Sequence, residues 1–243
     1  MSISVLVQDI KANIKIWSVV AVVMCLLVAQ FVAMTEGVMD LTTTVFYGMM
    51  SVIVPAIYTV ISSNGLIAGQ VDNGSMAYTL SSPIKRRSIV LTHMVFSTLS
   101  VLIIFLLTTV VHLIVANAMG VDTISNPKII LLNVGSFLAV LSLSGICFMF
   151  SGIFNRSKYS LGCGGGATVF FILMSMMAMF GGLSPSMKAL SNFKYLTVIS
   201  LYDTDSIIAG GSVWIIKAIA LFVLSIISYL IGSAWFCKKD LPL

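Results

Sequence analysis

The sequence predicts an all-α integral membrane protein with six transmembrane helices, and three observations lead to this fold class. Hydrophobic residues make up 59% of the 243 residues, and the mean hydropathy is +1.11. Charged residues make up only 9%, against roughly 25% in an average soluble domain. The charges also leave six long uncharged intervals between them. So few charges cannot cover a globule of this size, and the composition therefore excludes a soluble globular enzyme.

Residues 1–15 predict an amphipathic helix that lies in the cytoplasmic membrane interface, ahead of the first span. Five apolar side chains fall within roughly 100° of arc at helical spacing, and polar residues occupy the rest, which is the pattern of an interfacial helix. The apolar residues are Ile3, Leu6, Val7, Ile10 and Ile14. A frayed tail is the alternative.

Six uncharged segments follow, each long enough to cross a bilayer as a helix of about 20 residues. A charge at the bilayer centre costs about 2.5–3.5 kcal/mol on insertion scales, so long uncharged intervals mark spans. The predicted spans are residues 16–34, 44–66, 89–115, 129–154, 161–182 and 214–236. The whole chain, residues 1–243, is therefore expected to form a single transmembrane domain.

The loop charges predict that both termini are cytoplasmic. With the N-terminus inside, nine basic residues lie on the cytoplasmic side and four lie outside, in agreement with the positive-inside rule. The cytoplasmic set is Lys11, Lys15, Lys85, Arg86, Arg87, Arg156, Lys158, Lys238 and Lys239. The net charge of +5 is therefore attributed to topology and to contact with anionic membrane lipid, and not to nucleic-acid binding.

Two spans contain residues that disturb a regular apolar helix. Pro55 removes one backbone hydrogen bond, so a kink is expected in the second span, either as a lever or simply accommodated by packing. The fifth span begins with Gly162 and Gly166, whose spacing lets helices approach closely, within the chain or between protomers. An external segment, residues 183–213, precedes the last span, and its part 201–211 either stays outside or dips back into the membrane.

Residues 69–88, between the second and third spans, form the longest cytoplasmic loop and carry the most specific pattern. Asp72, Asn73 or Ser75 can cap a short helix, which Pro83 must end. On this helix one face holds Met76, Ala77 and Leu80, and Thr79 and Ser82 turn away. A short helix with an apolar face at the membrane mouth predicts a docking partner, whereas an ordinary polar loop is the alternative.

This loop resembles the corresponding loop of bacterial ABC-2 type transporter permeases. The family pattern is an acidic stretch, Gly-Thr or Gly-Ser, a short apolar helix, a Leu-Ser-x-Pro turn and basic residues before the third span. The matching residues run Gly69-Gln70-Val71-Asp72-Asn73-Gly74-Ser75-Met76-Ala77-Tyr78-Thr79-Leu80-Ser81-Ser82-Pro83-Ile84-Lys85-Arg86. The six spans, the N-terminal helix and the long external segment are also similar to that family. Gln70 departs from it, because family members commonly carry Glu there, so a salt bridge from this position is not available.

The resemblance implies a permease subunit of an ABC exporter in the bacterial cytoplasmic membrane. In that family the loop contains a coupling helix, which seats in a cleft of the ATP-hydrolysing subunit. The residues that would carry this role are Asp72, Gly74, Ser75, Met76, Tyr78, Leu80, Ser81, Pro83 and Arg86. The implied partners are two cytosolic ATPase subunits and a second permease subunit, which is either a copy or a sister chain. The chain needs no cofactor of its own, because ATP and Mg²⁺ belong to the ATPase.

Two other function classes compete with this interpretation. A rhomboid-like protease needs Gly-x-Ser-Gly and a histidine in its last span, but Ser142-Leu143 precede Ser144-Gly145, and neither histidine lies beyond residue 112. A secondary carrier or channel without ATP coupling is the remaining alternative, although no predicted span carries an acidic or basic residue at mid-depth. Members of the resembled family export drugs, lipids, glycans or peptides. A hydrophobic or amphipathic cargo is expected, and no residue identifies it.

Overall fold

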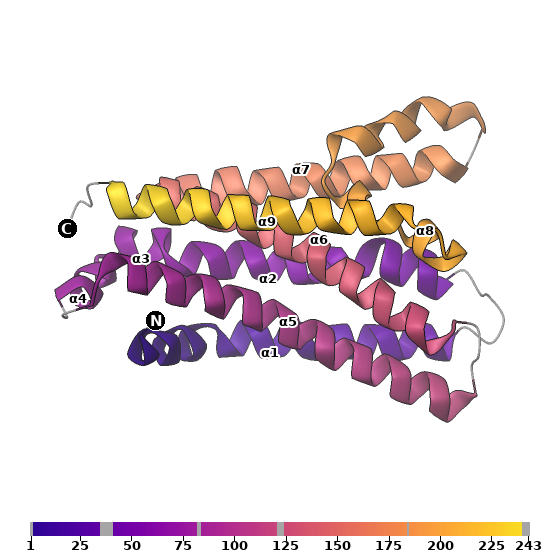
Figure 1. Cartoon of the computed structure of the whole chain (residues 1–243), viewed down its shortest axis with the longest axis horizontal. Helices are drawn as coiled ribbons and strands as arrows, with labels where there is room; N and C mark the ends of the chain where they lie inside the picture. The colour runs from indigo at the N-terminus through magenta and orange to yellow at the C-terminus, as the bar shows by residue number, and fades with distance from the viewer. Residues whose placement is uncertain (1, 35–40, 82–83, 121–123, 184, 240–243) are drawn as a thin grey trace.

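The computed structural model describes residues 2–34, 41–81, 84–120, 124–183 and 185–239 as an assembly of helices. Six of its helical stretches are long and apolar enough to cross a membrane, and they run side by side (Figure 1). They are α1 (Ile3–Ala33), η1 (Leu41–Met50) continued by α2 (Ser51–Leu66), α5 (Arg86–Met119), α6 (Asn126–Ile153), α7 (Ser157–Leu183) and α9 (Val213–Lys238). The predicted all-α membrane fold is therefore confirmed.

The short helices gather at the two ends of the bundle. They are α3 (Ala68–Asp72), α4 (Ser75–Ser81), η2 (Pro185–Leu196), η3 (Ile199–Leu201) and α8 (Thr204–Ala209). The start of α1, the pair α3–α4 and the end of α9 lie at one end, and α8 lies at the other (Figure 1). An even number of spans produces this arrangement, because it returns the chain to the side from which it started.

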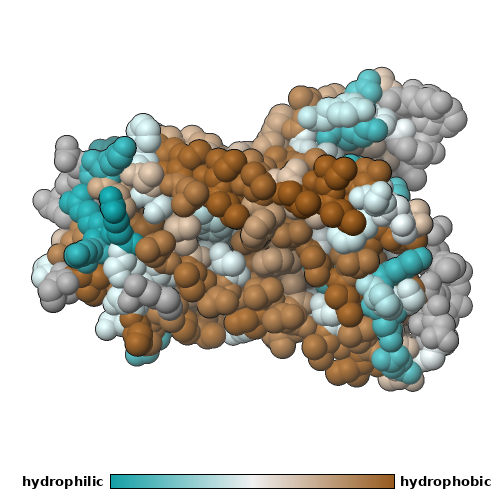
Figure 2. All heavy atoms as spheres, in the orientation of Figure 1, coloured by the Kyte–Doolittle hydropathy of each residue, from teal (hydrophilic) through white to brown (hydrophobic). Residues whose placement is uncertain are grey.

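The surface has the layered polarity of a membrane protein. Figure 2 shows hydrophobic residues covering the middle of the visible face, while hydrophilic residues gather toward the two ends. Large apolar side chains such as Ile57, Leu106 and Ile216 are exposed along the bundle. Apolar side chains exposed in such a band are favourable next to lipid, so the band corresponds to the membrane-embedded part.

The start of the chain differs from the predicted separate interfacial helix. Helix α1 is continuous from Ile3 to Ala33, so there is no break near residue 15. No glycine or proline interrupts this stretch, and a helix has no local reason to end there. The predicted apolar arc does face outward, with Ile3, Val7 and Ile10 exposed, while Asp9 and Asn13 are buried against the bundle. The first turns of α1 therefore belong to the packed bundle.

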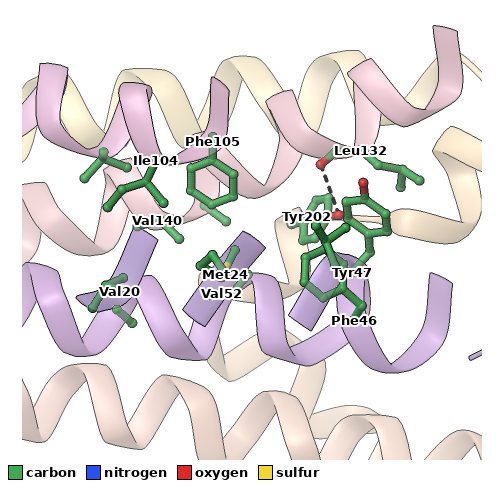
Figure 3. Close-up of a cluster of buried hydrophobic side chains, with 14 of the residues drawn as sticks. Val20, Met24, Phe46, Tyr47, Val52, Ile104, Phe105, Leu132, Val140 and Tyr202 are labelled. Atoms are coloured by element: carbon green, nitrogen blue, oxygen red, sulfur yellow. Dashed lines mark hydrogen bonds between the residues drawn. The ribbon is translucent and has the colours of Figure 1, made fainter. Parts of the chain in front are cut away.

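Helix α6 is the central helix, and the main hydrophobic core forms around it. In the most apolar 18-residue stretch of α6, 72% of the residues are buried, against 11% in the corresponding stretch of α7. Figure 3 shows side chains from α1, η1, α2, α5 and α6 meeting in this core, among them Met24, Phe46 and Val140. The Tyr202 hydroxyl donates a hydrogen bond to the carbonyl oxygen of Leu132 at 3.2 Å. Part of the segment 183–213, which was predicted to be external, therefore packs onto the bundle near the start of α6.

Asp203 fastens α8 to the last span. Its carboxylate accepts hydrogen bonds from the Ser206 amide at 3.0 Å and from the Ser206 hydroxyl at 2.7 Å, and it pairs with the Lys217 ammonium. Burial alone would raise the pKa of Asp203, but the Lys217 and Ser206 donors lower it below its ordinary value. The stability from this contact is therefore present above the ordinary pKa of aspartate and is lost as the pH falls through the lowered one.

We expect Lys217→Met to shift the acid-induced loosening of α8 to higher pH. The substitution removes the ammonium that lowers the pKa of Asp203, so the carboxylate becomes protonated earlier as the pH falls. Hydrogen exchange of the backbone amides of residues 204–209, followed against pH, measures the shift. Lys194→Met, which removes a lysine of η2 that forms no ion pair among the described residues, is the control. An unchanged profile for Lys217→Met would show that the ion pair does not hold α8.

Candidate functional site

The residues predicted to couple the chain to a partner form a compact helix pair at one end of the bundle. Helix α2 ends at Leu66, and Ile67 turns the backbone into α3. A second turn at Asn73 and Gly74 leads into α4. Gly74 has a φ of +75°, in the left-handed region that glycine adopts without strain. The predicted short helix is thus present as α4 and begins at Ser75.

The caps of this helix pair differ in part from the expectation. The Asn73 side-chain oxygen accepts a hydrogen bond from the Ser75 amide at 3.0 Å, so Asn73 caps α4. The Asp72 carboxylate instead accepts a hydrogen bond from the backbone amide of Ser157 at 3.2 Å. Ser157 begins α7, and a carboxylate is favourable at the positive end of a helix. Of the three candidate caps, the structure therefore selects Asn73, whereas Asp72 joins the loop to the fifth span.

Burial separates the predicted docking residues into two groups. Met76 is fully buried in a cluster that includes Leu66, Val90 and Phe236, and Leu80 packs partly against the same cluster. Tyr78 is 86% exposed. The predicted contact surface is therefore wrong for Met76, because its side chain anchors α4 to the bundle. Within α4 the large side chain available to a partner is Tyr78.

The faces of α4 differ in part from the predicted pattern. The pattern placed Thr79 away from the face that holds Met76, Ala77 and Leu80, but Thr79 is buried, as Met76 is. Ser81 is exposed, and its hydroxyl donates to the Tyr78 carbonyl oxygen at 2.8 Å. Ser82 and Pro83 lie outside the described residues, so the predicted stop at Pro83 stays a prediction. The outward face of α4 is therefore the one that carries Tyr78 and Ser81.

Further hydrogen bonds tie the helix pair to the spans. The Ser151 hydroxyl, near the end of α6, accepts a hydrogen bond from the Ala68 amide at 3.0 Å. The Asn64 side-chain amide, at the end of α2, donates to the Ser157 hydroxyl at 2.7 Å. The chain connection to α2 and the bonds to α6 and α7 therefore hold α3, and the turn at Asn73 and Gly74 joins α4 to it.

Arg86 connects the ends of two other spans. Its Nη1 donates a hydrogen bond to the carbonyl oxygen of Lys239 at 3.2 Å, which ties the start of α5 to the end of α9. The Lys239 ammonium donates to the Phe154 carbonyl oxygen at 3.1 Å. Burial lowers the pKa of Lys239 to about 8. Arg86 therefore takes part in helix packing beside α4.

The glycines predicted to pack closely in the fifth span face open space within this chain. A Cβ on Gly162 or Gly166 would meet nothing within 4 Å. Their neighbours Gly164 and Gly165 make the close contacts instead, with Cys147 of α6 and Val60 of α2. The intramolecular version of the prediction is therefore wrong, and a contact between protomers stays a prediction. The kink predicted at Pro55 also stays a prediction, although the winding changes from π to α one turn before it.

A much closer contact between spans lies elsewhere, between α6 and α9, and sequence inspection missed it. A Cβ on Gly152 would overlap the carbonyl oxygen of Gly232, and a Cβ on Gly232 would lie 2.8 Å from the Cα of Met149. Gly145 approaches the Ser225 carbonyl oxygen in the same way. The pattern that could have revealed the contact is a seven-residue spacing of small residues in both helices, at 145 and 152 and at 225 and 232.

Buried polar networks cross the bundle at several depths. The Nδ1 of His93 lies 2.8 Å from the Asp9 carboxylate, and both side chains are 1% exposed. Ser97, Ser144 and Tyr229 share a triangle of hydroxyl contacts between 2.8 and 3.0 Å. A third network joins Tyr47, His112 and Asn133. Both histidines are thus buried inside the bundle and are not at its surface.

Helix α4 has features that are typical of a partner-binding surface. Helix α4 is attached to the bundle through the buried Met76 and carries one exposed aromatic side chain, Tyr78. Within the described ranges, no three His, Cys, Asp or Glu side chains lie close enough to hold a metal ion. An exposed tyrosine on a fixed helix can fill a partner's pocket.

Comparison with known proteins gives one family. The family model described as ABC-2 family transporter protein matches residues 4–241 of the chain. No curated protein matches the chain.

Proposed function

Since the chain belongs to the ABC-2 family of transporter proteins, we propose that it is the permease subunit of an ATP-driven exporter. As a member of this family it is a membrane-spanning subunit of an ABC transport system. In the proposal, two separate cytosolic ATPase subunits and a second permease subunit complete the transporter in a bacterial cytoplasmic membrane. ATP-driven closure of the ATPases pushes on α4, and the spans attached to α4 move with it.

The exposed Tyr78 on the anchored helix α4 is the observation that carries the proposal. Tyr78 is 86% exposed, and Met76, two residues earlier, is fully buried. Helix α4 therefore has one free face and one attached face. The attached face packs through Met76 into the cluster that includes Leu66, Val90 and Phe236. The preceding helix α3 is bonded to α6 through Ser151 and to α7 through Asp72. An element that transmits force needs this arrangement, because it must contact the partner with one face and the transport pathway with the opposite face.

The arrangement of the termini supports a cytoplasmic position for α4. The start of α1, the helix pair α3–α4 and the end of α9 share one end of the bundle (Figure 1). The nine basic residues of the predicted cytoplasmic set belong to segments at this end. Since positively charged segments remain in the cytoplasm, we propose that this end faces the ATPase.

An apolar hollow between α1 and α5 supports a hydrophobic or amphipathic cargo. Its volume is about 240 Å³, and its walls include Ile10, Trp17 and Leu99. It opens on the side of the bundle between two membrane-crossing helices. A cargo that enters from the bilayer could occupy such a hollow without losing apolar contact. We propose this class of cargo over a water-soluble one.

We expect Tyr78→Asp to abolish coupling to the ATPase. A buried tyrosine contributes roughly 1.5–3 kcal/mol to a contact, and a carboxylate in its place would also have to be desolvated. Binding should weaken at least about tenfold, since each 1.4 kcal/mol is a factor of ten. The measurement is the amount of ATPase subunit that co-purifies with the tagged chain from native membranes, together with cargo-stimulated ATP hydrolysis.

Tyr195→Asp is the matched control, because Tyr195 is 79% exposed and lies on η2 at the opposite end of the bundle. The control should retain both the ATPase subunit and the stimulation. Unchanged retention and stimulation in Tyr78→Asp would exclude α4 as the coupling element. ATP hydrolysis by the purified chain alone would exclude the whole assignment.

A second candidate function, an ion-coupled secondary carrier, is favoured by the buried Asp9–His93 pair. Carriers commonly place ionisable groups inside the bundle, and these two side chains are 1% exposed. Transport into inverted membrane vesicles separates the two functions. The exporter requires ATP and continues when an uncoupler removes the proton gradient, whereas a carrier stops with the uncoupler and does not require ATP.

A further inference from the structure

A pocket of about 670 Å³ opens where α5 begins and α9 ends. One part of its wall is cationic and is formed by Lys85, Arg86, Arg87 and Lys238. Figure 2 shows hydrophilic residues gathered at this end of the visible face, directly beside the hydrophobic band. The pocket therefore lies at the level where the membrane-embedded surface meets the polar end of the bundle.

No carboxylate among the described residues pairs with the basic side chains of this pocket. The carboxylate contacts with a basic side chain found within residues 2–34, 41–81, 84–120, 124–183 and 185–239 lie elsewhere, at Asp9–His93 and at Asp203–Lys217. The first turn of α5 contains no acidic residue. Basic side chains at this positive end of a helix are unfavourable. An anion in the pocket would relieve this repulsion.

The rest of the wall is apolar and continues along the spans. Leu91, one turn into α5 from the basic residues, is 49% exposed, and Leu230 of α9 is 57% exposed. Ala234 lies between Leu230 and the cationic end of α9. A ligand that fills this pocket must therefore carry negative charge at one end and hydrocarbon at the other.

We propose that the pocket binds an anionic phospholipid from the leaflet at this end of the bundle. The phosphate contacts Lys85, Arg87 and Lys238, and an acyl chain lies against Leu91 and Leu230. Basic pockets between membrane helices bind anionic head groups in this way, because charge attraction and apolar contact act together. Arg86 contributes less to the phosphate, since its guanidinium already donates to the Lys239 carbonyl oxygen. This site is independent of the coupling role proposed for α4.

The test uses the full chain purified in detergent micelles and native mass spectrometry of bound lipid. Dioleoyl-phosphatidylglycerol and dioleoyl-phosphatidylcholine are titrated separately, since they share acyl chains and differ in charge. We expect phosphatidylglycerol to bind at least about tenfold more tightly, because several basic residues act on one head group. The triple variant Lys85→Gln, Arg87→Gln, Lys238→Gln should lose this preference.

The matched control is Lys11→Gln, Lys15→Gln, Lys158→Gln, which removes the same charge from exposed residues at the same end of the bundle. The control should keep the preference. Equal binding of the two lipids, or an equal loss in both triple variants, would overturn the proposal. Complete displacement of the lipid by excess inorganic phosphate would also overturn it in favour of a soluble anion. Leu230→Trp, which keeps every charge and fills the apolar groove, should weaken phosphatidylglycerol binding if the charge variant does not fold.

Discussion

Replacing Gly152 by alanine is expected to push α6 and α9 apart and to destabilise the bundle severely. The added Cβ would overlap the carbonyl oxygen of Gly232, which belongs to the backbone and cannot rotate away. Overpacking of a well-filled core typically costs 1–3 kcal/mol, and we expect a loss above about 3 kcal/mol here. Thermal unfolding of the purified chain in detergent measures it, with an expected decrease of roughly 6–12 °C in the apparent Tm. Gly232→Ala should behave in the same way.

Gly162→Ala is the control, since it makes the same change in a helix where the new Cβ meets nothing within 4 Å. Alanine is a better helix former than glycine by about 0.5–1 kcal/mol, so this variant should be slightly more stable. A similar Tm for Gly152→Ala and the unmodified chain would contradict the α6–α9 contact. A stable Gly162→Ala chain that no longer pairs with a second permease subunit would support the predicted contact between protomers.

Replacing Asp9 by alanine is expected to be the most damaging change at a polar position. The substitution leaves His93 buried without the carboxylate that lies 2.8 Å from its Nδ1. Its Nε2 has no hydrogen-bond partner among the residues that the structure describes. Removal of one member of a buried pair costs about 3–5 kcal/mol, because the other member stays desolvated. Apparent unfolding free energies in detergent measure the loss.

A double-mutant cycle tests whether the loss comes from the pair itself. The double variant Asp9→Ala, His93→Ala should lose less than the two single losses added together, by about 0.5–3 kcal/mol, as contacting residues do. Additive losses would show that the two side chains do not interact. Lys11→Ala is the control, because Lys11 is exposed and lies two residues after Asp9 in α1. Its unfolding free energy should stay within about 0.5 kcal/mol of that of the unmodified chain.

The Asp9–His93 pair also bears on the transport mechanism. It joins the first turns of α1 to α5, and the backbone amide of Ser2 donates to the Thr92 hydroxyl at 2.9 Å nearby. Helix α5 follows α4 along the chain. If ATP-driven movement of α4 reaches α5, then α1 should move with it, because a buried pair resists separation.

The loop of residues 69–88, for which a coupling role is proposed, shows where inference from sequence succeeded and where it stopped. A capped helix after Asn73-Gly74 could be predicted, because caps and the left-handed glycine act between neighbouring residues. The outward face of that helix could not. Met76, Tyr78 and Leu80 are all large side chains, and only packing against Leu66, Val90 and Phe236 selects Met76 for burial.

The sequence by itself determined the membrane class, the six spans and the family-specific loop. Each depends on local properties, namely uncharged length, charge distribution and a contiguous motif. The partners of small and polar residues were decided by the tertiary structure alone. Gly152 contacts Gly232 across 80 residues of chain, Asp9 pairs with His93, and Gly162 and Gly166 face open space. Helical periodicity defines a face of each helix, but the rotation and offset of two packed helices determine which residues meet on it.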